Sequence, residues 1–125
     1  IYFFFGEYTA LLYFISGVYG ISILEAQNYF SHYGLSRKKT EYGSYEKVKA
    51  HHSWNSDHVL GRILLFELTR HSGHHYNGAK NYQILESKSD SPILPFGYPA
   101  MLVLSYFPFL FIPLMNKQLK QYKLS

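Results

Sequence analysis

An apolar segment at the N-terminus limits the folds open to this chain of 125 residues. Residues 1–24 carry a single charged side chain, that of Glu7. A helix needs roughly 20 predominantly apolar residues to cross a bilayer, and glycines such as Gly17 and Gly20 suit such helices because they allow close packing. We therefore predict a transmembrane helix over residues 1–24, with a buried core helix as the alternative.

Basic residues follow this segment and indicate its orientation. Arg37, Lys38 and Lys39 come shortly after it, and the whole chain has a formal net charge of +4. Cytoplasmic loops of membrane proteins carry an excess of lysine and arginine, so residues 25–91 are expected in the cytoplasm. Because the basic residues flank apolar segments, a membrane surface is an expected partner and nucleic acid is not.

A second uncharged segment extends from Pro92 to Met115. It contains all five prolines of the chain, and proline interrupts a helix because it lacks the backbone N–H and clashes with the preceding turn. A second span would also place the three lysines that follow it outside the cell, against the usual bias. We predict that residues 92–125 form a proline-broken tail that lies on the membrane or covers the site.

Three of the seven histidines occur together in residues 70–75, which read Arg-His-Ser-Gly-His-His. Asn55 or Ser56 can cap a helix that runs to about Tyr76, and on that helix the three imidazoles share one face within an arc of roughly 100°. Neutral imidazoles bind Zn, Cu, Fe and Ni, so this face is a candidate metal site. The alternative is a solvated helix end whose histidines face the negative pole of the helix dipole. The residues on this face are His71, His74 and His75, with Glu67 one turn earlier.

The other histidines lie in less informative surroundings. His32 is near the end of a helix that is expected to continue from the membrane to a terminator at Gly34. His51 and His52 occur in a polar loop with no helical face to direct them, and His58 projects away from the cluster in residues 70–75. The chain has no cysteine, so a metal must be held by histidine and carboxylate.

Three ordered motifs resemble those of the integral-membrane alkane 1-monooxygenases. Residues 28–35 read Asn-Tyr-Phe-Ser-His-Tyr-Gly-Leu and resemble the family's Asn-Tyr-X-Glu-His-Tyr-Gly. Residues 51–58 read His-His-Ser-Trp-Asn-Ser-Asp-His and resemble His-Ser-Trp-Asn-Ser-Asn-His. Residues 68–75 read Leu-Thr-Arg-His-Ser-Gly-His-His and resemble Leu-Gln-Arg-His-Ser-Asp-His-His. Xylene monooxygenase hydroxylases share this pattern, and membrane fatty-acid desaturases and hydroxylases share it more distantly.

The resemblance implies a mainly α fold, namely a membrane helix bundle fragment with a cytoplasmic, histidine-rich helical cap. It implies a non-haem diiron centre with two iron ions. Two further histidine motifs of the family do not occur in these residues, so the chain resembles the C-terminal part of such an enzyme and is expected to be inactive alone. The family's iron ligands carry over to His32, His71, His74 and His75.

Further residues near these histidines are candidates to orient the ligands. Ser31 stands where the family has Glu, which removes a carboxylate beside the metal and alters the groups that support the ligands. Gly73 stands where the family has Asp, but it projects opposite the histidine face, so no ligand is expected to be lost. The orienting candidates are Asn28, Ser31, Glu67 and Arg70.

The resemblance also implies a reaction and its partners. The expected reaction is hydroxylation of the terminal methyl group of an alkane, with O₂ as oxidant and rubredoxin as electron donor. The expected location is the bacterial inner membrane, which the full-length protein would cross several times, with the active site facing the cytoplasm. Two alternatives stay open at this point: a hydroxylase or desaturase acting on fatty-acyl or aromatic-methyl substrates, and a non-catalytic, membrane-anchored module that binds metal.

Overall fold

The computed structural model describes residues 2–76, 78–87 and 90–124. Within these residues the regular structure is helical, which confirms the predicted mainly α fold, and the only β-type pairings are two isolated bridges. Two single-turn 3₁₀ helices, η1 and η2, lie between the α-helices. The elements are α1 (Tyr2–His32), η1 (Ala50–His52), α2 (Val59–Leu64), α3 (His71–Tyr76), η2 (Tyr82–Ile84), α4 (Tyr98–Ser105) and α5 (Pro108–Leu124).

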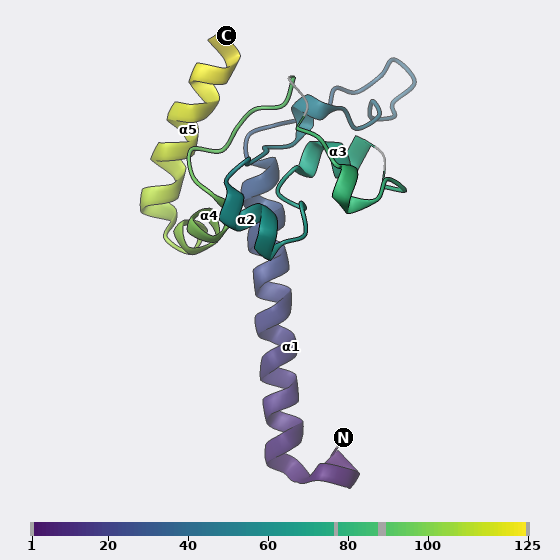
Figure 1. The fold of residues 1–125 in the computed structure, drawn as a ribbon, viewed down its shortest axis with the longest axis vertical. Coiled ribbons are helices and arrows are strands. Elements are labelled where there is room, and N and C mark those ends of the chain that lie inside the picture. The colour runs from purple at the N-terminus through teal and green to yellow at the C-terminus, as the bar shows by residue number, and fades with distance from the viewer. Residues whose placement is uncertain (1, 77, 88–89, 125) are drawn as a thin grey trace.

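Helix α1 extends away from the rest of the molecule, and the other elements gather around its C-terminal end (Figure 1). Among the described residues it is the one helix long and apolar enough to cross a membrane, and none of its apolar window is buried within the structure. Gly6 breaks the helical geometry near the N-terminus with a φ of 84°. This exposed apolar surface suits a lipid environment, and the crossing itself stays a prediction.

The C-terminal end of α1 is closed by two devices. Gly34 adopts a left-handed φ of 69°, as expected for a helix terminator, and the Leu35 N–H donates back to the His32 carbonyl at 3.1 Å. Trp54 covers the same end: its backbone N–H donates to the Ser31 carbonyl and its indole N–H donates to the Tyr33 carbonyl, both at 2.8 Å. Carbonyls that a helix end leaves unpaired are therefore satisfied by a distant segment.

A small apolar core lies against this end of α1. Trp54 is fully buried, and the rings of Phe30 and Tyr98 meet edge to face with centroids 5.0 Å apart. Through these contacts the core joins α1, α4 and α5 to the segment between η1 and α2. Its buried members are Phe30, Trp54, Leu94, Tyr98, Met101, Phe111 and Met115.

The prediction of one helix from Asn55 or Ser56 to about Tyr76 is wrong. Helix α2 ends at Leu64, and the chain then turns through Phe66 and Glu67, which both have left-handed φ values, 48° and 61°. Left-handed backbone is costly for residues other than glycine, so other interactions must hold it. The Glu67 carboxylate accepts three hydrogen bonds from the Arg62 guanidinium, at 2.8, 2.9 and 3.1 Å, which close the turn.

The second apolar segment is divided between two helices. The division falls at Tyr106 and Phe107, and Pro108 is the first residue of α5, where a missing N–H costs nothing. Pro113 is accommodated inside α5. The structure thus divides the proline-rich segment between α4 and α5, and the tail's association with the membrane stays a prediction.

Candidate metal centre

Three imidazoles from two helices converge where the end of α1 meets α3. The Nε2 atom of His71 lies 3.3 Å from Nε2 of His32 and 2.9 Å from Nε2 of His75. One ligand atom from each of the three residues lies within 4.8 Å of the others. His71 is buried, His32 is half-buried and His75 is exposed, so the cluster has one open side.

The spacing of these nitrogens fits a shared metal ion. Two imidazole nitrogens bound to one ion at about 2.1 Å lie roughly 3.0–3.4 Å apart for bond angles between about 90° and 109°. The two Nε2 distances of 2.9 and 3.3 Å fall close to that range. A hydrogen bond between neutral imidazoles would pair only two of the three nitrogens, whereas a metal ion satisfies all three. The arrangement can therefore hold one transition-metal ion.

The ring of His32 is held in the tautomer that a metal needs. Its Nδ1 lies 2.9 Å from the His52 carbonyl oxygen, which can only accept, so Nδ1 carries the proton and Nε2 keeps its lone pair. The Ser53 hydroxyl lies 3.4 Å from the same Nδ1. A carbonyl partner of this kind fixes both the orientation and the basicity of a histidine ligand.

The environment of His71 and His75 keeps their rings neutral. Burial, followed by the neighbouring imidazoles of His75, His32 and His74, lowers the pKa of His71 to about 3. Burial also lowers the pKa of His75, with His32 and His74 contributing. A histidine must be deprotonated to bind a metal, so neutral rings at physiological pH favour binding.

His74 does not join the other three in this structure. Its ring centroid lies 6.2 Å from that of His71 and 5.7 Å from that of His75. It lines a hollow of about 340 Å³ together with His71, His75 and Asn28. Of the four ligands expected from the motifs, the structure thus brings three to one point and places the fourth beside them.

Asn55 positions the helix that carries the clustered histidines. This residue is fully buried; its Oδ1 accepts from the Ser72 backbone N–H at 2.9 Å, and its Nδ2 donates to the Ser72 hydroxyl at 2.8 Å. Ser72 lies in the first turn of α3, so Asn55 caps α3 from a distance instead of starting its own helix. Spacing in the sequence did not predict this role; the only signal was the row Ser-Trp-Asn-Ser, in which three polar residues flank a tryptophan.

We name residues 52–55 the strap, because they run across the ends of both ligand-bearing helices. The strap contributes the His52 carbonyl and the Ser53 hydroxyl near His32, Trp54 over the end of α1, and Asn55 at the start of α3. It is itself anchored by backbone hydrogen bonds between Asn55 and the segment at Pro92 and Leu94. The relative position of the two helices therefore depends on this short segment.

Three of the residues expected to orient the ligands instead hold the surrounding fold. The buried Ser31 hydroxyl donates to the Tyr98 hydroxyl at 3.1 Å, away from the histidines. Glu67 pairs with Arg62, so its predicted place on the histidine face is not observed. Arg70 donates to the Leu85 carbonyl at 2.6 Å and lies 3.3 Å from an Asp57 carboxylate oxygen. Asn28 alone of the four borders the hollow beside the histidines.

Glu46, His51 and His52 form a second cluster, which sequence spacing did not indicate. The Lys49 backbone N–H donates to Nδ1 of His52 at 3.0 Å, so the proton of a neutral His52 ring is on Nε2, which faces a Glu46 carboxylate oxygen at 3.4 Å. That tautomer cannot bind a metal through Nε2. The Glu46 carboxylate is also occupied by Lys49 at 2.9 Å. This cluster is therefore an ion-paired loop contact.

Comparison with known proteins identifies relatives along nearly the whole chain. Alkane 1-monooxygenase 1 of Alcanivorax borkumensis is 43% identical over 119 residues, which are 95% of this chain. Alkane 1-monooxygenase 2 of Pseudomonas aeruginosa is 40% identical over 118 residues, or 94% of the chain. The chain is a homologue of the alkane 1-monooxygenases. No family model matches it.

The relatives are longer than this chain. The matched residues are 30% of the Alcanivorax borkumensis relative and 31% of the Pseudomonas aeruginosa one. A more distant relative is the xylene/toluene monooxygenase hydroxylase component of Pseudomonas putida. It is 34% identical over 73 residues, which are 58% of this chain and 18% of that protein. The predicted resemblance is thus confirmed, and the activity of the whole protein belongs to the proposal below.

Proposed function

We propose that this chain forms part of a membrane-bound, non-haem diiron monooxygenase that hydroxylates the terminal methyl group of alkanes. The main support is the convergence of three histidines in a homologue of the alkane 1-monooxygenases. Nε2 of His71 lies 2.9 Å from Nε2 of His75 and 3.3 Å from Nε2 of His32. O₂ would be the oxidant and rubredoxin the electron donor. His74 would serve the second iron ion.

The chemistry explains why a metal is required. A terminal C–H bond is strong and has no polar handle, so bound iron would supply the oxidising power that no side chain has. The residues of this chain would hold the iron and place it next to the substrate. The strap orients His32, burial keeps His71 neutral, and the apolar α1 would hold the site next to the lipid in which an alkane dissolves.

Metal analysis of the complete protein tests the ligand assignment. Replacing His32, His71 or His75 by alanine should lower bound iron per chain and abolish hydroxylation, since each removes one of three converging donors. His74→Ala should remove no more than one of the two irons, because His74 stands apart. His58→Ala is the matched control, as His58 is exposed and outside both histidine clusters. Unchanged iron by elemental analysis in the three converging variants would show that the assignment is wrong.

An aromatic methyl substrate is the second candidate, because the xylene/toluene monooxygenase component is also a relative. Octane and xylene supplied separately, with rubredoxin and its reductase, distinguish the two: 1-octanol alone supports the alkane, and methylbenzyl alcohol alone supports the aromatic. Fatty-acyl substrates can be compared in the same assay. Iron binding with no product from any of them would favour a non-catalytic metal-binding module.

We also propose that α1 crosses the bacterial inner membrane once and that residues 25–125 lie on the cytoplasmic side. The support is the exposed apolar surface of α1 and the basic residues that follow it. Residues 1–125 contain no cysteine, so a cysteine introduced here is unique among them; any cysteine elsewhere in the protein is replaced by serine before labelling. Lys123→Cys should resist an impermeant maleimide in intact cells and react after lysis. Strong labelling in intact cells would mean that the 92–115 segment crosses the membrane.

A further inference from the structure

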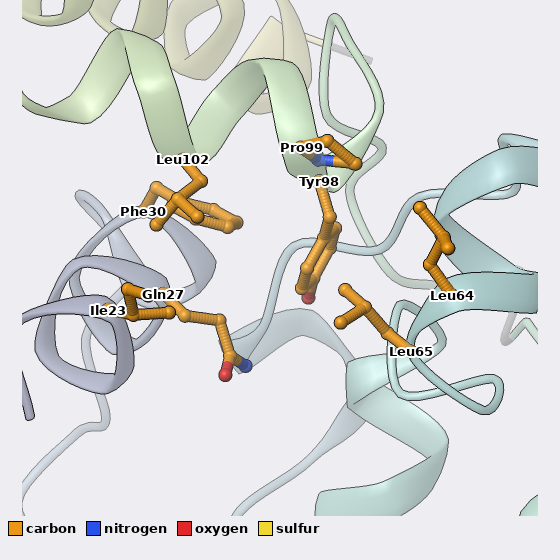
Figure 2. Close-up of a pocket in the computed structure, with 8 residues that line it drawn as sticks. All are labelled: Ile23, Gln27, Phe30, Leu64, Leu65, Tyr98, Pro99 and Leu102. Carbon is orange, nitrogen blue, oxygen red and sulfur yellow. The ribbon is translucent and has the colours of Figure 1, made fainter. Parts of the chain in front are cut away.

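An apolar cavity of about 150 Å³ lies between α1, α4 and the turn that follows α2. Its walls include Ile23 and Phe30 of α1, Leu65 and Leu102 (Figure 2). Its polar side chains are few. The hydroxyl of Tyr98, which also lines it, is held by Ser31 and faces the Trp54 carbonyl at 3.4 Å.

Gln27 is the exception, and it connects the cavity to the histidines. Figure 2 shows its side chain reaching from α1 into the space between Phe30, Tyr98 and Leu65. Its amide has no hydrogen-bond partner among the residues that the structure describes. Gln27 also borders the hollow lined by His71, His74 and His75. The apolar cavity and the metal-side hollow are therefore neighbours that share one side chain.

The size and chemistry of the cavity indicate its occupant. An apolar protein cavity of about 150 Å³ stays dry and binds a molecule the size of benzene, so it accepts about six carbon atoms. Burying each methylene contributes about 0.8 kcal/mol, or about a fourfold gain in affinity. A hydrocarbon that fills this cavity and continues past Gln27 would bring its next carbons into the hollow beside the histidines.

We propose that this cavity is the binding site for an alkyl segment of about six carbons, and that Gln27 separates it from the metal-side hollow. The proposal rests on the proposed function for its substrate class, and it adds the location of the chain and the residues that limit its size. Leu65, which lies across the cavity from Ile23 in Figure 2, and Leu102 of α4 both line it and thereby limit how much hydrocarbon fits.

Photo-crosslinking in the complete, iron-free protein tests the cavity directly. The probe is n-decane that carries a diazirine at carbon 5, and labelled peptides are identified by mass spectrometry. Labelling is expected in residues 23–30 or 98–102. Leu65→Trp fills the cavity and should lower that labelling by about tenfold or more, because excluding two methylenes already costs about sixteenfold in affinity. Ile63→Trp, on the exposed side of α2, is the matched control and should label as the wild type does.

A second variant keeps the test decisive if tryptophan disturbs folding. Leu65→Ala enlarges the cavity, so a bulky adamantyl diazirine should label this variant at the same peptides and not the wild type. Labelling that persists in Leu65→Trp, or adamantyl labelling equal in both proteins, would overturn the proposal and mean that another part of the protein fills the cavity. Iron content and hydroxylation are measured separately, so loss of these with intact labelling refutes the proposed function alone.

Discussion

Asn55→Ala should loosen the metal centre without touching any histidine. The buried Asn55 side chain makes hydrogen bonds of 2.9 and 2.8 Å with Ser72 and one of 3.3 Å with the Ser87 hydroxyl. Alanine would leave the Ser72 N–H unpaired inside the protein, and an unpaired buried donor costs about 1–3 kcal/mol. This hydrogen bond is itself the cap of α3, whose loss typically costs about 1 kcal/mol, so we expect a total of about 1–3 kcal/mol.

The effect should appear in metal affinity as well as in stability. Removing a group that supports metal ligands typically costs about 10- to 100-fold in affinity, and Asn55 sets the position of the helix that carries His71 and His75. The assay is titration of the complete iron-free protein with Co(II), followed in the visible spectrum, together with denaturant unfolding. Asn81→Ala is the matched control, because Asn81 is exposed and its side chain makes no cap hydrogen bond.

A companion variant separates the two hydrogen bonds to Ser72. Ser72→Ala keeps the backbone N–H that Asn55 accepts and loses only the hydroxyl contact, so its cost should be about 0.5–1.5 kcal/mol. The double variant should cost less than the sum of the single ones, since the residues share a contact. If Asn55→Ala unfolds at the wild-type denaturant concentration and binds Co(II) equally well, then Asn55 does not position α3.

Three further changes probe the framework of the site. Gly34→Ala forces a side chain into the left-handed φ of 69° and should lower the free energy of unfolding by about 1–2 kcal/mol, measured by denaturant titration. A Cβ at Gly73 would lie 2.9 Å from the Glu86 carbonyl oxygen, so Gly73→Ala should destabilise by about 1–3 kcal/mol and weaken Co(II) binding; wild-type values for both would refute the contact. The Lys38 N–H, and then Lys49, lower the pKa of Glu46 from 4.5 to about 2, so this carboxylate stabilises its loop above pH 4.5 and the contribution is lost as the pH falls toward 2. The protection of the Lys38 amide against hydrogen exchange should fall over this pH range in the wild type and not in Glu46→Gln.

Local sequence signals predicted the extent of α1, the interruption of the later apolar segment and the grouping of the histidines. The uncharged run and Gly34 gave the extent of α1, because apolar length and a glycine terminator act within a few residues. The later apolar segment is divided just before Pro108, which begins α5, whereas Pro113 lies inside that helix. The grouping of histidines predicted a metal site, and His32, His71 and His75 do converge.

The break between α2 and α3 could not be predicted from periodicity. Apolar residues continue at helical spacing through Phe66, and nothing in that pattern marks a left-handed turn at Phe66 and Glu67. The turn is held by the Arg62–Glu67 pair and by contacts from residues distant in sequence, which override local helix propensity. The same long-range hydrogen bonds gave Asn55 its role as a cap for another helix.

The break is nevertheless what makes the site geometrically possible. On a continuous helix His71 would lie roughly 18 Å along the axis from Val59, at about 1.5 Å per residue. At that distance His71 would lie far from the strap, which precedes Val59 in the chain. The turn instead frees α3 to pack where the strap directs it. Trp54 fixes one end of the strap to the carbonyls that close α1, and the adjacent Asn55 fixes the other end to the first turn of α3. Because consecutive residues hold both helices, the separation of His32 and His71 is set over one peptide unit, which is a short enough link to keep two Nε2 atoms 3.3 Å apart.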